Sequence, residues 1–309
     1  MNVLVTGGAG FIGSHIVEAL QGRARVRVLD DFRTGRRENL AGLDCELIEG
    51  SVLDPAALAR AVEGVDTVFH LAAMVSVPES MRDPAQCVRI NAGGTVAVLE
   101  AAAAAGARKL VLSSTAAVYG NNPSVPKVES MTPEPMSPYA VTKLDGEYYC
   151  SIFQRQGRIE TTCLRFFNVF GPRQDPRGAY ASAIPIFITR ALRGEPLAIH
   201  GDGLQTRDFI YVKDIAAANL FAATTPGLNG VFNTGYGART TILDIARDIL
   251  RLTGSASPLE HRPERAGDIR HSLADTSRLA AAGFHPSGNL AEGLRATVEW
   301  YRNHPGVFS

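Results

Sequence analysis

The first thirteen residues constrain the fold more than any other stretch, because they are typical of a strand, a tight turn and a helix. A short apolar run at 3–5 is followed by glycines at positions 7, 10 and 13, and apolar residues then recur at helical spacing. Gly7 permits a sharp turn, and Gly10 lets the backbone approach a pyrophosphate without a Cβ in the way. Free N–H groups at the start of the helix would face the phosphates. The stretch predicts a dinucleotide-binding turn.

An acidic residue ends the second predicted strand, 25–29. Asp30 follows that strand directly, and an acid there accepts hydrogen bonds from the adenosine ribose and repels a 2′-phosphate. We therefore expect NAD and not NADP as the cofactor. The simpler alternative is a surface aspartate that ends a strand beside Asp31, which the glycines upstream make less favourable. The polar stretch 31–38 is long enough to wrap the adenosine side of the cofactor.

Composition excludes several classes of function. The 31 basic residues balance 31 acidic ones, and no charge run marks a surface for nucleic acid or a membrane. The cysteines at 45, 87, 150 and 163 show no spacing typical of a metal site, so we expect no metal and reduced thiols. Without a basic leader or an apolar run of membrane-spanning length, the sequence predicts a cytoplasmic protein.

Strands and helices alternate along the first half of the chain. This pattern predicts an α/β protein with a Rossmann-type doubly wound parallel sheet, covered on both faces. Beyond Phe166 the order loosens, which indicates a smaller α/β substrate-binding domain. We expect residues 1–167 to form the nucleotide-binding domain, with a return near 208–236, and 168–309 to form mainly the second domain. Further strands are predicted at 46–48, 67–71 and 109–113, and helices at 55–62, 91–105, 184–192, 212–223, 242–252 and 290–301.

A tyrosine and a lysine share one face of the helix predicted to begin after Ser137. Tyr139 and Lys143 are four residues apart, so their side chains point to the same side. A phenol is a poor base at neutral pH, but a nearby ammonium and a nicotinamide cation lower its pKa. Tyr139 is therefore a candidate general base for a sugar or alcohol hydroxyl. The hydroxyls of 113–115 at the end of the fifth strand would bond the reacting oxygen, or simply cap the strand.

Taken together, these motifs resemble a known family. The glycine turn, the His-Leu-Ala-Ala segment 70–73, the segment 113–120 and the Tyr139/Lys143 pair occur in the order found in the extended short-chain dehydrogenases/reductases. Within that family the chain is similar to NAD-dependent nucleotide-sugar epimerases and dehydratases. The resemblance implies a triad of Thr115, Tyr139 and Lys143, with Lys143 also holding the nicotinamide ribose.

The resemblance also implies which residues hold the cofactor. Ser51 stands where many members carry an adenine-contacting aspartate, and Val75 replaces a lysine, so these positions depart from the pattern. The implied NAD-binding residues are Gly7, Gly10, Phe11, Ile12, Asp30, Asp31, Thr34, Gly35, Ser51, Val52, Leu71, Ala72, Ala73, Asn91, Ser113, Tyr139, Lys143 and Phe166.

In the second half, the same resemblance implies a nucleotide-sugar site. Arg207 and Arg265 would clamp the diphosphate, which suits the planar guanidinium fork, although either could form an ordinary surface salt bridge. Asn168 would contact the diphosphate as well, and His200 would lie by the base where members often carry an aromatic ring. The implied substrate-binding residues are Thr115, Tyr139, Asn168, Ala183, Ile184, Phe187, Ala198, His200, Arg207, Arg265, Asp268 and Ser272.

The residues that follow Thr115 distinguish between the reactions that members of the family catalyse. Members that dehydrate or decarboxylate typically carry an acid there, and this chain has Ala116 and Ala117. What remains is 4-epimerisation of a UDP-hexose through a transient 4-keto sugar. The small Ser272 predicts that N-acetylated sugars are admitted as well. Alternatives are a UDP-glucuronate 4-epimerase, with Arg177 as the candidate cation, or a non-catalytic NAD-sensing protein. A homodimer built on the helices near 91–105 and 138–156 is expected from the resemblance.

Overall fold

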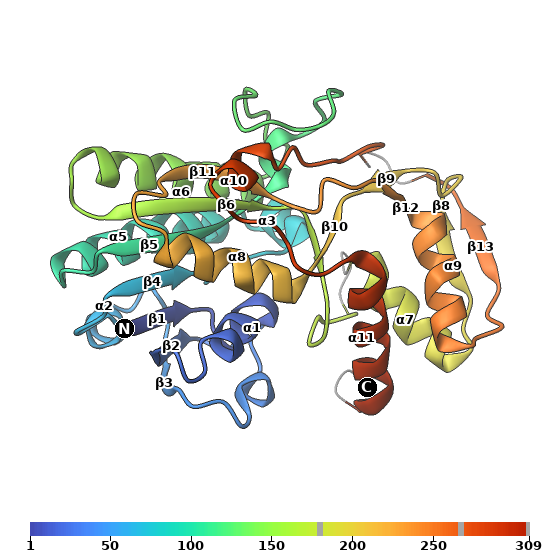
Figure 1. The fold of residues 1–309 in the computed structure, drawn as a ribbon, viewed down its shortest axis with the longest axis horizontal. Coiled ribbons are helices and arrows are strands. Elements are labelled where there is room, and N and C mark those ends of the chain that lie inside the picture. The colour runs from blue at the N-terminus through green and yellow to red at the C-terminus, as the bar shows by residue number, and fades with distance from the viewer. Residues whose placement is uncertain (178–181, 265–268, 307–309) are drawn as a thin grey trace.

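Seven parallel strands form one large sheet, at the left of Figure 1. The computed structural model describes residues 1–177, 182–264 and 269–306. The strand order is β11-β6-β5-β4-β1-β2-β3, and every neighbouring pair is parallel. The strands are β1 (Asn2–Thr6), β2 (Arg25–Asp30), β3 (Glu46–Glu49), β4 (Thr67–His70), β5 (Lys109–Thr115), β6 (Glu160–Phe166) and β11 (Gly230–Thr234). The predicted Rossmann-type α/β fold is confirmed.

Helices cover both faces of this sheet, as the continuous apolar strands require. On one face α1 (Phe11–Ala19) packs against α8 (Val212–Thr224), and their apolar side chains form one core cluster with the strands. On the other face α2 (Pro55–Val62), α5 (Gly94–Ala104) and α6 (Pro138–Arg155) form a second cluster. The chain therefore returns to the sheet with α8 and β11 after leaving it at β6.

One predicted helix is interrupted. The stretch 91–105 was expected as a single helix, but residues Val88–Gly93 are π-helical and α5 begins only at Gly94. The Thr95 hydroxyl donates to the Asn91 carbonyl at 2.6 Å, and the Asn91 amide bonds both backbone groups of Met74. Side chains that enter the helix ladder in this way favour a local widening of the helix.

The rest of the chain packs around a third core cluster, at the right of Figure 1. Three two-stranded sheets lie here or at the junction with the large sheet. Their strands are β7 (Asn168–Phe170) with β10 (Phe209–Tyr211), β9 (Thr206–Arg207) with β12 (Thr240–Thr241), and β8 (Leu197–His200) with β13 (Leu259–Arg262). The helices are α7 (Ala183–Arg193), α9 (Ile242–Thr253) and α11 (Leu290–Asn303). Short helices α3 (Val77–Arg82), α4 (Pro84–Cys87) and α10 (Ser277–Ala281) complete the fold.

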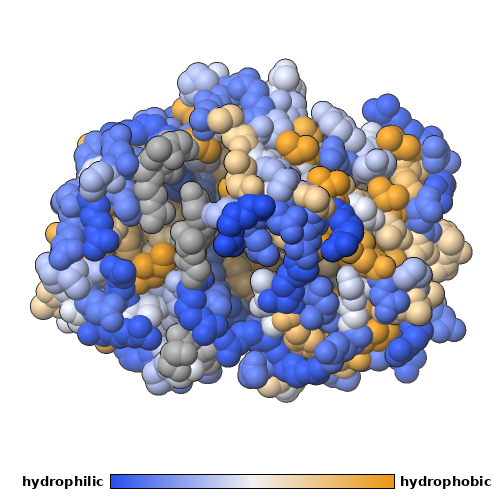
Figure 2. Space-filling model, turned by 180° about the vertical axis from the view of Figure 1, so that it is seen from behind, coloured by the Kyte–Doolittle hydropathy of each residue, from blue (hydrophilic) through white to orange (hydrophobic). Residues whose placement is uncertain are grey.

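The carboxyl ends of the seven strands meet at one edge of the large sheet. The strand order reverses at β1, which lies between β2 and β4, and such a switch point is where open α/β sheets bind ligands. The second part of the chain lies beside this edge, and Figure 2 shows the surface hollowed near the middle of the molecule. Within the described ranges, no helix combines the length and the apolar character needed to cross a membrane.

Candidate active site

The turn between β1 and α1 has room for backbone but not for side chains. Gly7 has a φ of +70°, and a Cβ there would lie 2.8 Å from the Ala72 nitrogen. A Cβ on Gly13 would lie 2.2 Å from the Gly7 carbonyl oxygen. Gly10 caps α1, whose first N–H groups have no partner within the helix. The glycines therefore leave the backbone of this turn free of side chains at the switch point, which is the geometry that the predicted pyrophosphate contact needs.

Asp30 lies against this turn. Its carboxylate accepts hydrogen bonds from the Ala9 nitrogen at 2.8 Å and the Phe32 nitrogen at 2.9 Å. Burial raises the pKa of Asp30, and these two hydrogen bonds oppose the rise. A Cβ on Gly35 would lie 2.7 Å from the carboxylate, so the following loop folds closely over the acid. The acid and the phosphate-binding turn are thus neighbours, which is the arrangement that a ribose contact needs.

The candidate triad meets at the junction of β5 and α6. Ser137 and Pro138 begin α6 as predicted, because the Ser137 hydroxyl accepts from the Ala140 nitrogen. The Thr115 hydroxyl lies close enough to the Tyr139 phenol to act on its pKa, while the Lys143 ammonium donates to a backbone carbonyl, that of Ser113, at 2.9 Å. All three predicted residues are therefore brought together at one edge of the sheet.

The electrostatics of the triad differ in one respect from the prediction. Burial lowers the pKa of Lys143 from 10.5 to about 8. Burial also raises the pKa of Tyr139, and the neighbouring Thr115 hydroxyl only partly opposes the rise. The ammonium of Lys143 therefore does not lower the pKa of Tyr139 as the sequence predicted. The reason is geometric, because the ammonium bonds the Ser113 carbonyl instead of the phenol oxygen.

His70 is buried and had no role in the sequence analysis. Its ring connects Thr6, at the end of β1, to Thr95 in α5. Thr6 Oγ1 accepts from the Ala72 nitrogen at 3.3 Å, and it donates to His70 Nδ1 at 2.7 Å because the proton of the neutral ring is on Nε2. Thr95 Oγ1 donates to the Asn91 carbonyl, so it accepts from His70 Nε2 at 3.1 Å. Burial lowers the pKa of His70 to about 3, which keeps the ring neutral. His70 thus ties β1, β4 and α5 together.

The remaining predicted cofactor residues differ in their burial and in their hydrogen bonds. Leu71, Ala72 and Ala73 are half-buried at the sheet edge, as are Phe11 and Ile12, whereas Asp31 and Thr34 are exposed. Val52 and Phe166 are buried in the two core clusters of the sheet. Ser51 uses its hydroxyl to accept from the Leu53 nitrogen, and the Asn91 amide is engaged with Met74 and Thr142. Contacts of these residues with a cofactor stay a prediction.

On the substrate side, the short strand β9 carries Arg207 next to a buried carboxylate. Asp208 is fully buried and accepts from three backbone nitrogens, those of Tyr236, Gly237 and Ala274. These bonds join β9 to two other loops and so fix the place of Arg207. The sequence analysis missed Asp208, although its position directly after a candidate clamp arginine was visible in the sequence.

Two further predicted residues flank this strand. The Ser272 nitrogen donates to the Thr206 carbonyl at 3.1 Å, and the Asn168 amide donates to the Asp208 carbonyl at 3.3 Å. Arg207, Ser272 and Asn168 therefore lie in neighbouring segments. Arg265 and Asp268 fall outside the described residues, so their predicted roles are not addressed by the structure.

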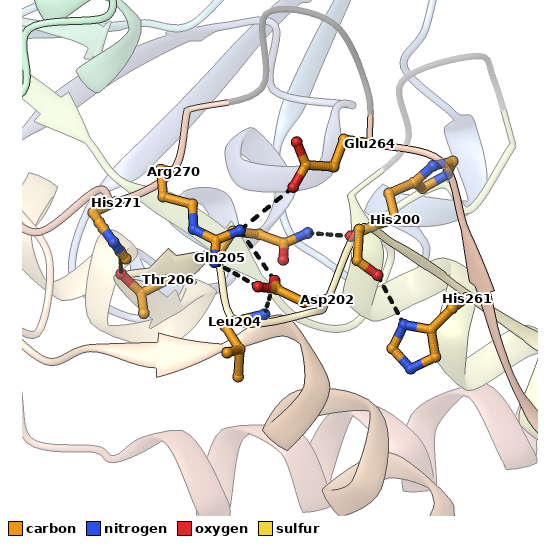
Figure 3. A network of polar contacts seen from close by, with 10 residues as sticks. His200, Asp202, Leu204, Gln205, Thr206, His261, Glu264, Arg270 and His271 are labelled. Carbon is orange, nitrogen blue, oxygen red and sulfur yellow. Dashed lines mark hydrogen bonds and ion pairs between the residues drawn. The ribbon is translucent and has the colours of Figure 1, made fainter.

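A polar network surrounds the strand predicted to contact the base (Figure 3). His200 lies at the end of β8 and bonds the Pro263 carbonyl through Nδ1 at 3.1 Å. The Arg270 guanidinium pairs with Asp202 through bonds of 2.6 and 3.0 Å, and it also contacts Glu264 at 3.7 Å. Since these ion pairs are exposed, each contributes little to stability, but together they connect the turn after β8 to the segment after β13.

The other predicted substrate residues differ in their surroundings. Ala198 and Ala183 are half-buried, whereas Ile184 and Phe187 pack inside the third core cluster. Arg177, the cation considered for a uronate, pairs with Asp175 at 3.0 Å. Within the described parts of the chain, no group of histidine, cysteine or acidic residues could hold a metal ion.

Comparison with known proteins identifies the family. The family model described as "NAD dependent epimerase/dehydratase family" matches residues 3–235. The chain belongs to the NAD-dependent epimerase/dehydratase family. It is 38% identical to the UDP-glucose 4-epimerase of Mycolicibacterium smegmatis, over 98% of this chain and 99% of that protein.

Two solved structures of this family are close in fold. The UDP-N-acetylglucosamine 4-epimerase of Methanobrevibacter ruminantium, in complex with UDP-N-acetylmuramic acid, is 41% identical, with 98% of each chain covered and a TM-score of 0.95. The UDP-glucose 4-epimerase of Thermotoga maritima, with UDP-glucose, is 40% identical, with 99% of this chain and all of that one covered and a TM-score of 0.94.

Membership of this family agrees with the glycine turn described above. The cofactor is NAD, as predicted. The close approach that Gly7 and Gly13 permit, and the acid at Asp30, fit a dinucleotide whose pyrophosphate lies at the start of α1 and whose ribose lies at the end of β2. The family includes UDP-sugar 4-epimerases that act on different sugars, so membership leaves the substrate open.

Proposed function

We propose that this protein is an NAD-dependent UDP-hexose 4-epimerase. The observation that carries the proposal is the junction of Tyr139, Thr115 and Lys143 at the sheet edge, with alanines at 116 and 117. A second acid or base is needed to dehydrate or decarboxylate a sugar, and the residues that follow Thr115 offer none. A single phenol is sufficient when one proton leaves a hydroxyl and later returns to it.

In the proposed mechanism, bound NAD would supply the acceptor for the hydride of the sugar C4 and the donor that returns it. Thr115 holds the C4 hydroxyl, and Tyr139 takes its proton as the C4–O bond becomes a carbonyl. Lys143 carries a positive charge in about nine molecules in ten at pH 7, given its pKa of about 8. Because the protein's own groups do not lower the pKa of Tyr139, the positive charge of a bound nicotinamide would supply the field that favours the phenolate. When the 4-keto sugar has turned over, Tyr139 returns the proton and the other epimer is formed.

The range of sugars depends on the pocket beside β9. Ser272 is half-buried and bonded to the strand that carries Arg207, and a side chain this small obstructs an N-acetyl group less than a bulky one would. We infer that UDP-GlcNAc and UDP-GalNAc are accepted beside UDP-Glc and UDP-Gal. A Ser272→Tyr variant should lose turnover of the acetylated pair by at least about tenfold, while the non-acetylated pair changes little. Equal losses on both pairs would contradict this role.

We also propose a homodimer. Along α6, Val141, Tyr148 and Ile152 are exposed to 41%, 56% and 45%, and their spacing places them on one side of the helix. Exposed apolar stripes of this kind favour association with another surface. Light scattering should give a mass of about twice 33.0 kDa. A monomer at micromolar concentration would contradict the proposal. A cytoplasmic location stays a prediction.

The function is tested by incubating the purified holoenzyme separately with UDP-glucose, UDP-GlcNAc and UDP-glucuronate, and following the C4 epimers by NMR. We expect epimers from the first two, and none from the Tyr139→Phe variant. Turnover of UDP-glucuronate alone would replace the proposal with the uronate epimerase. Retention of NAD with no turnover of any of the three would favour an NAD-sensing role.

A further inference from the structure

Three side chains on one face of α6 contact three consecutive residues at the end of β5. Tyr139, Lys143 and Glu147 are spaced four residues apart, so they follow one another along the helix. The Tyr139 phenol lies by the Thr115 hydroxyl, the Lys143 ammonium donates to the Ser113 carbonyl at 2.9 Å, and the Ser114 hydroxyl donates to the Glu147 carboxylate at 2.5 Å. The candidate triad supplies two of these contacts, and Glu147 supplies the third.

Glu147 is an unusual residue for this position because it is a buried charge. Its side chain is 3% exposed, and that of its partner Arg165 is 4% exposed. Arg165 donates from Nε at 2.9 Å and from Nη2 at 2.7 Å, so the guanidinium holds both carboxylate oxygens as a fork. In the sheet Arg165 lies directly opposite Ser114, and the two therefore approach the carboxylate from neighbouring strands.

The same guanidinium reaches the turn that follows Thr115. Its Cζ lies 4.8 Å from the centre of the Tyr119 ring, and the Tyr119 hydroxyl donates to Asn233 on β11 at 2.6 Å. The carboxylate of Glu147 is thus held by Arg165 from β6, and the Tyr119 ring that packs against the same guanidinium is bonded to β11. Since the carboxylate is held, it is a rigid acceptor for the Ser114 hydroxyl.

We propose that Glu147 is a positioning residue, whose Arg165-held carboxylate anchors Ser114 and so sets the spacing between Thr115 on β5 and the Tyr139/Lys143 face of α6. The proposal rests on the epimerase function proposed above. Ser114 lies between the residue that receives Lys143 and the residue that lies by the Tyr139 phenol, so its displacement moves both contacts together. Misplacement by about 1 Å commonly reduces turnover by about a hundredfold.

A buried ion pair could instead serve stability alone, and the chain offers a matched comparison. Ser114→Ala removes the bond to Glu147 and leaves the ion pair intact. Thr161→Val is the control, because the Thr161 hydroxyl also joins a sheet strand to α6, donating to the Cys150 carbonyl at 3.1 Å at the other end of the helix. A purely structural role predicts similar, small effects of both substitutions on melting temperature and activity.

Kinetics of the holoenzyme variants give the first test. For Ser114→Ala we expect kcat to fall by about ten- to a hundredfold, with KM changed by no more than about twofold, since the residue touches no substrate. For Thr161→Val we expect both constants within about twofold of the wild type. A Ser114→Ala kcat equal to that of the Thr161→Val variant overturns the proposal.

Lysine NMR gives a second test that does not depend on turnover. The chain has four lysines, at 109, 127, 143 and 213, so ¹³C-labelled lysine side chains give a spectrum that can be assigned by substitution. In Ser114→Ala the pKa of Lys143 should move from about 8 toward its ordinary value as the junction loosens. In Thr161→Val it should stay. An unchanged Lys143 titration in Ser114→Ala overturns the proposal. The titration can be measured even if the wild type turns over no UDP-sugar, so a failure of the proposed function is distinguished from a failure of the positioning role.

Discussion

Replacing Lys143 with methionine should abolish epimerisation and yet stabilise the protein at neutral pH. The pKa of Lys143 is lowered from 10.5 to about 8 because its ammonium is buried. A difference of that size corresponds to about 3 kcal/mol by which the fold disfavours the charged form. Methionine carries no charge but loses the hydrogen bond to the Ser113 carbonyl, which costs about 1 kcal/mol. The net expectation at pH 7 is a gain of about 2 kcal/mol in the free energy of unfolding.

The gain should depend on pH in a defined direction. Below pH 8 both the folded and the unfolded wild type hold the proton, so the fold bears the full cost of the buried charge. Between pH 8 and 10.5 the folded state has released the proton and the unfolded state has not, and the stability of the wild type therefore rises by about 1.4 kcal/mol per pH unit. The advantage of Lys143→Met should be lost near pH 9.5.

Urea unfolding of both proteins at pH 7 and pH 9.5, after removal of bound NAD, measures this difference. Lys213→Met is the control, because that side chain is 60% exposed, and its stability should match the wild type within about 0.5 kcal/mol at both pH values. A Lys143→Met variant less stable than the wild type at pH 7, or a difference that does not change with pH, would refute the role assigned to burial.

Three further substitutions test other parts of the structure. Gly13→Ala places a Cβ 2.2 Å from the Gly7 carbonyl, so it should lose at least about 2 kcal/mol of stability in urea unfolding together with NAD binding, whereas Gly93→Ala, with no atom closer than 3.9 Å, should lose neither. Arg165→Met leaves Glu147 buried without its partner and should lower the free energy of unfolding by about 3–5 kcal/mol. The double variant with Glu147→Met should recover most of this loss, and no recovery would contradict a paired charge. Asp30→Ala should raise the Kd for NAD by about tenfold or more and reduce discrimination against NADP in a fluorescence titration, and unchanged discrimination would exclude Asp30 from the ribose site.

Local patterns in the sequence were sufficient to predict a parallel sheet with the strands β1 to β5, but not β6 and β11, and Thr115 was assigned to the triad only through the family resemblance. The glycine turn depends on residues within one strand-turn-helix unit, and the Tyr139/Lys143 pair depends on one helical turn. The π-helical interruption at Val88–Gly93 was missed because it involves Asn91 and Met74, which are separated by 17 residues in the sequence.

The buried polar groups around the triad were missed for the same reason. Glu147 has the appearance of a surface residue in a mixed helix, and only the fold brings Arg165 to it. His70 was visible as part of a motif, but its partners Thr6 and Thr95 come from two other elements. Helical spacing also predicted that Lys143 lies beside Tyr139, but not that its ammonium is bonded to a strand carbonyl.

The most direct test of the proposed function follows the hydrogen on C4. The holoenzyme is incubated with UDP-glucose carrying deuterium at C4, without added nucleotide, and the UDP-galactose formed is examined by NMR and mass spectrometry. Hydride transfer to bound NAD and back predicts that the product keeps deuterium at C4. Product in which solvent hydrogen has replaced the deuterium, or the absence of any C4 epimer, would contradict the mechanism.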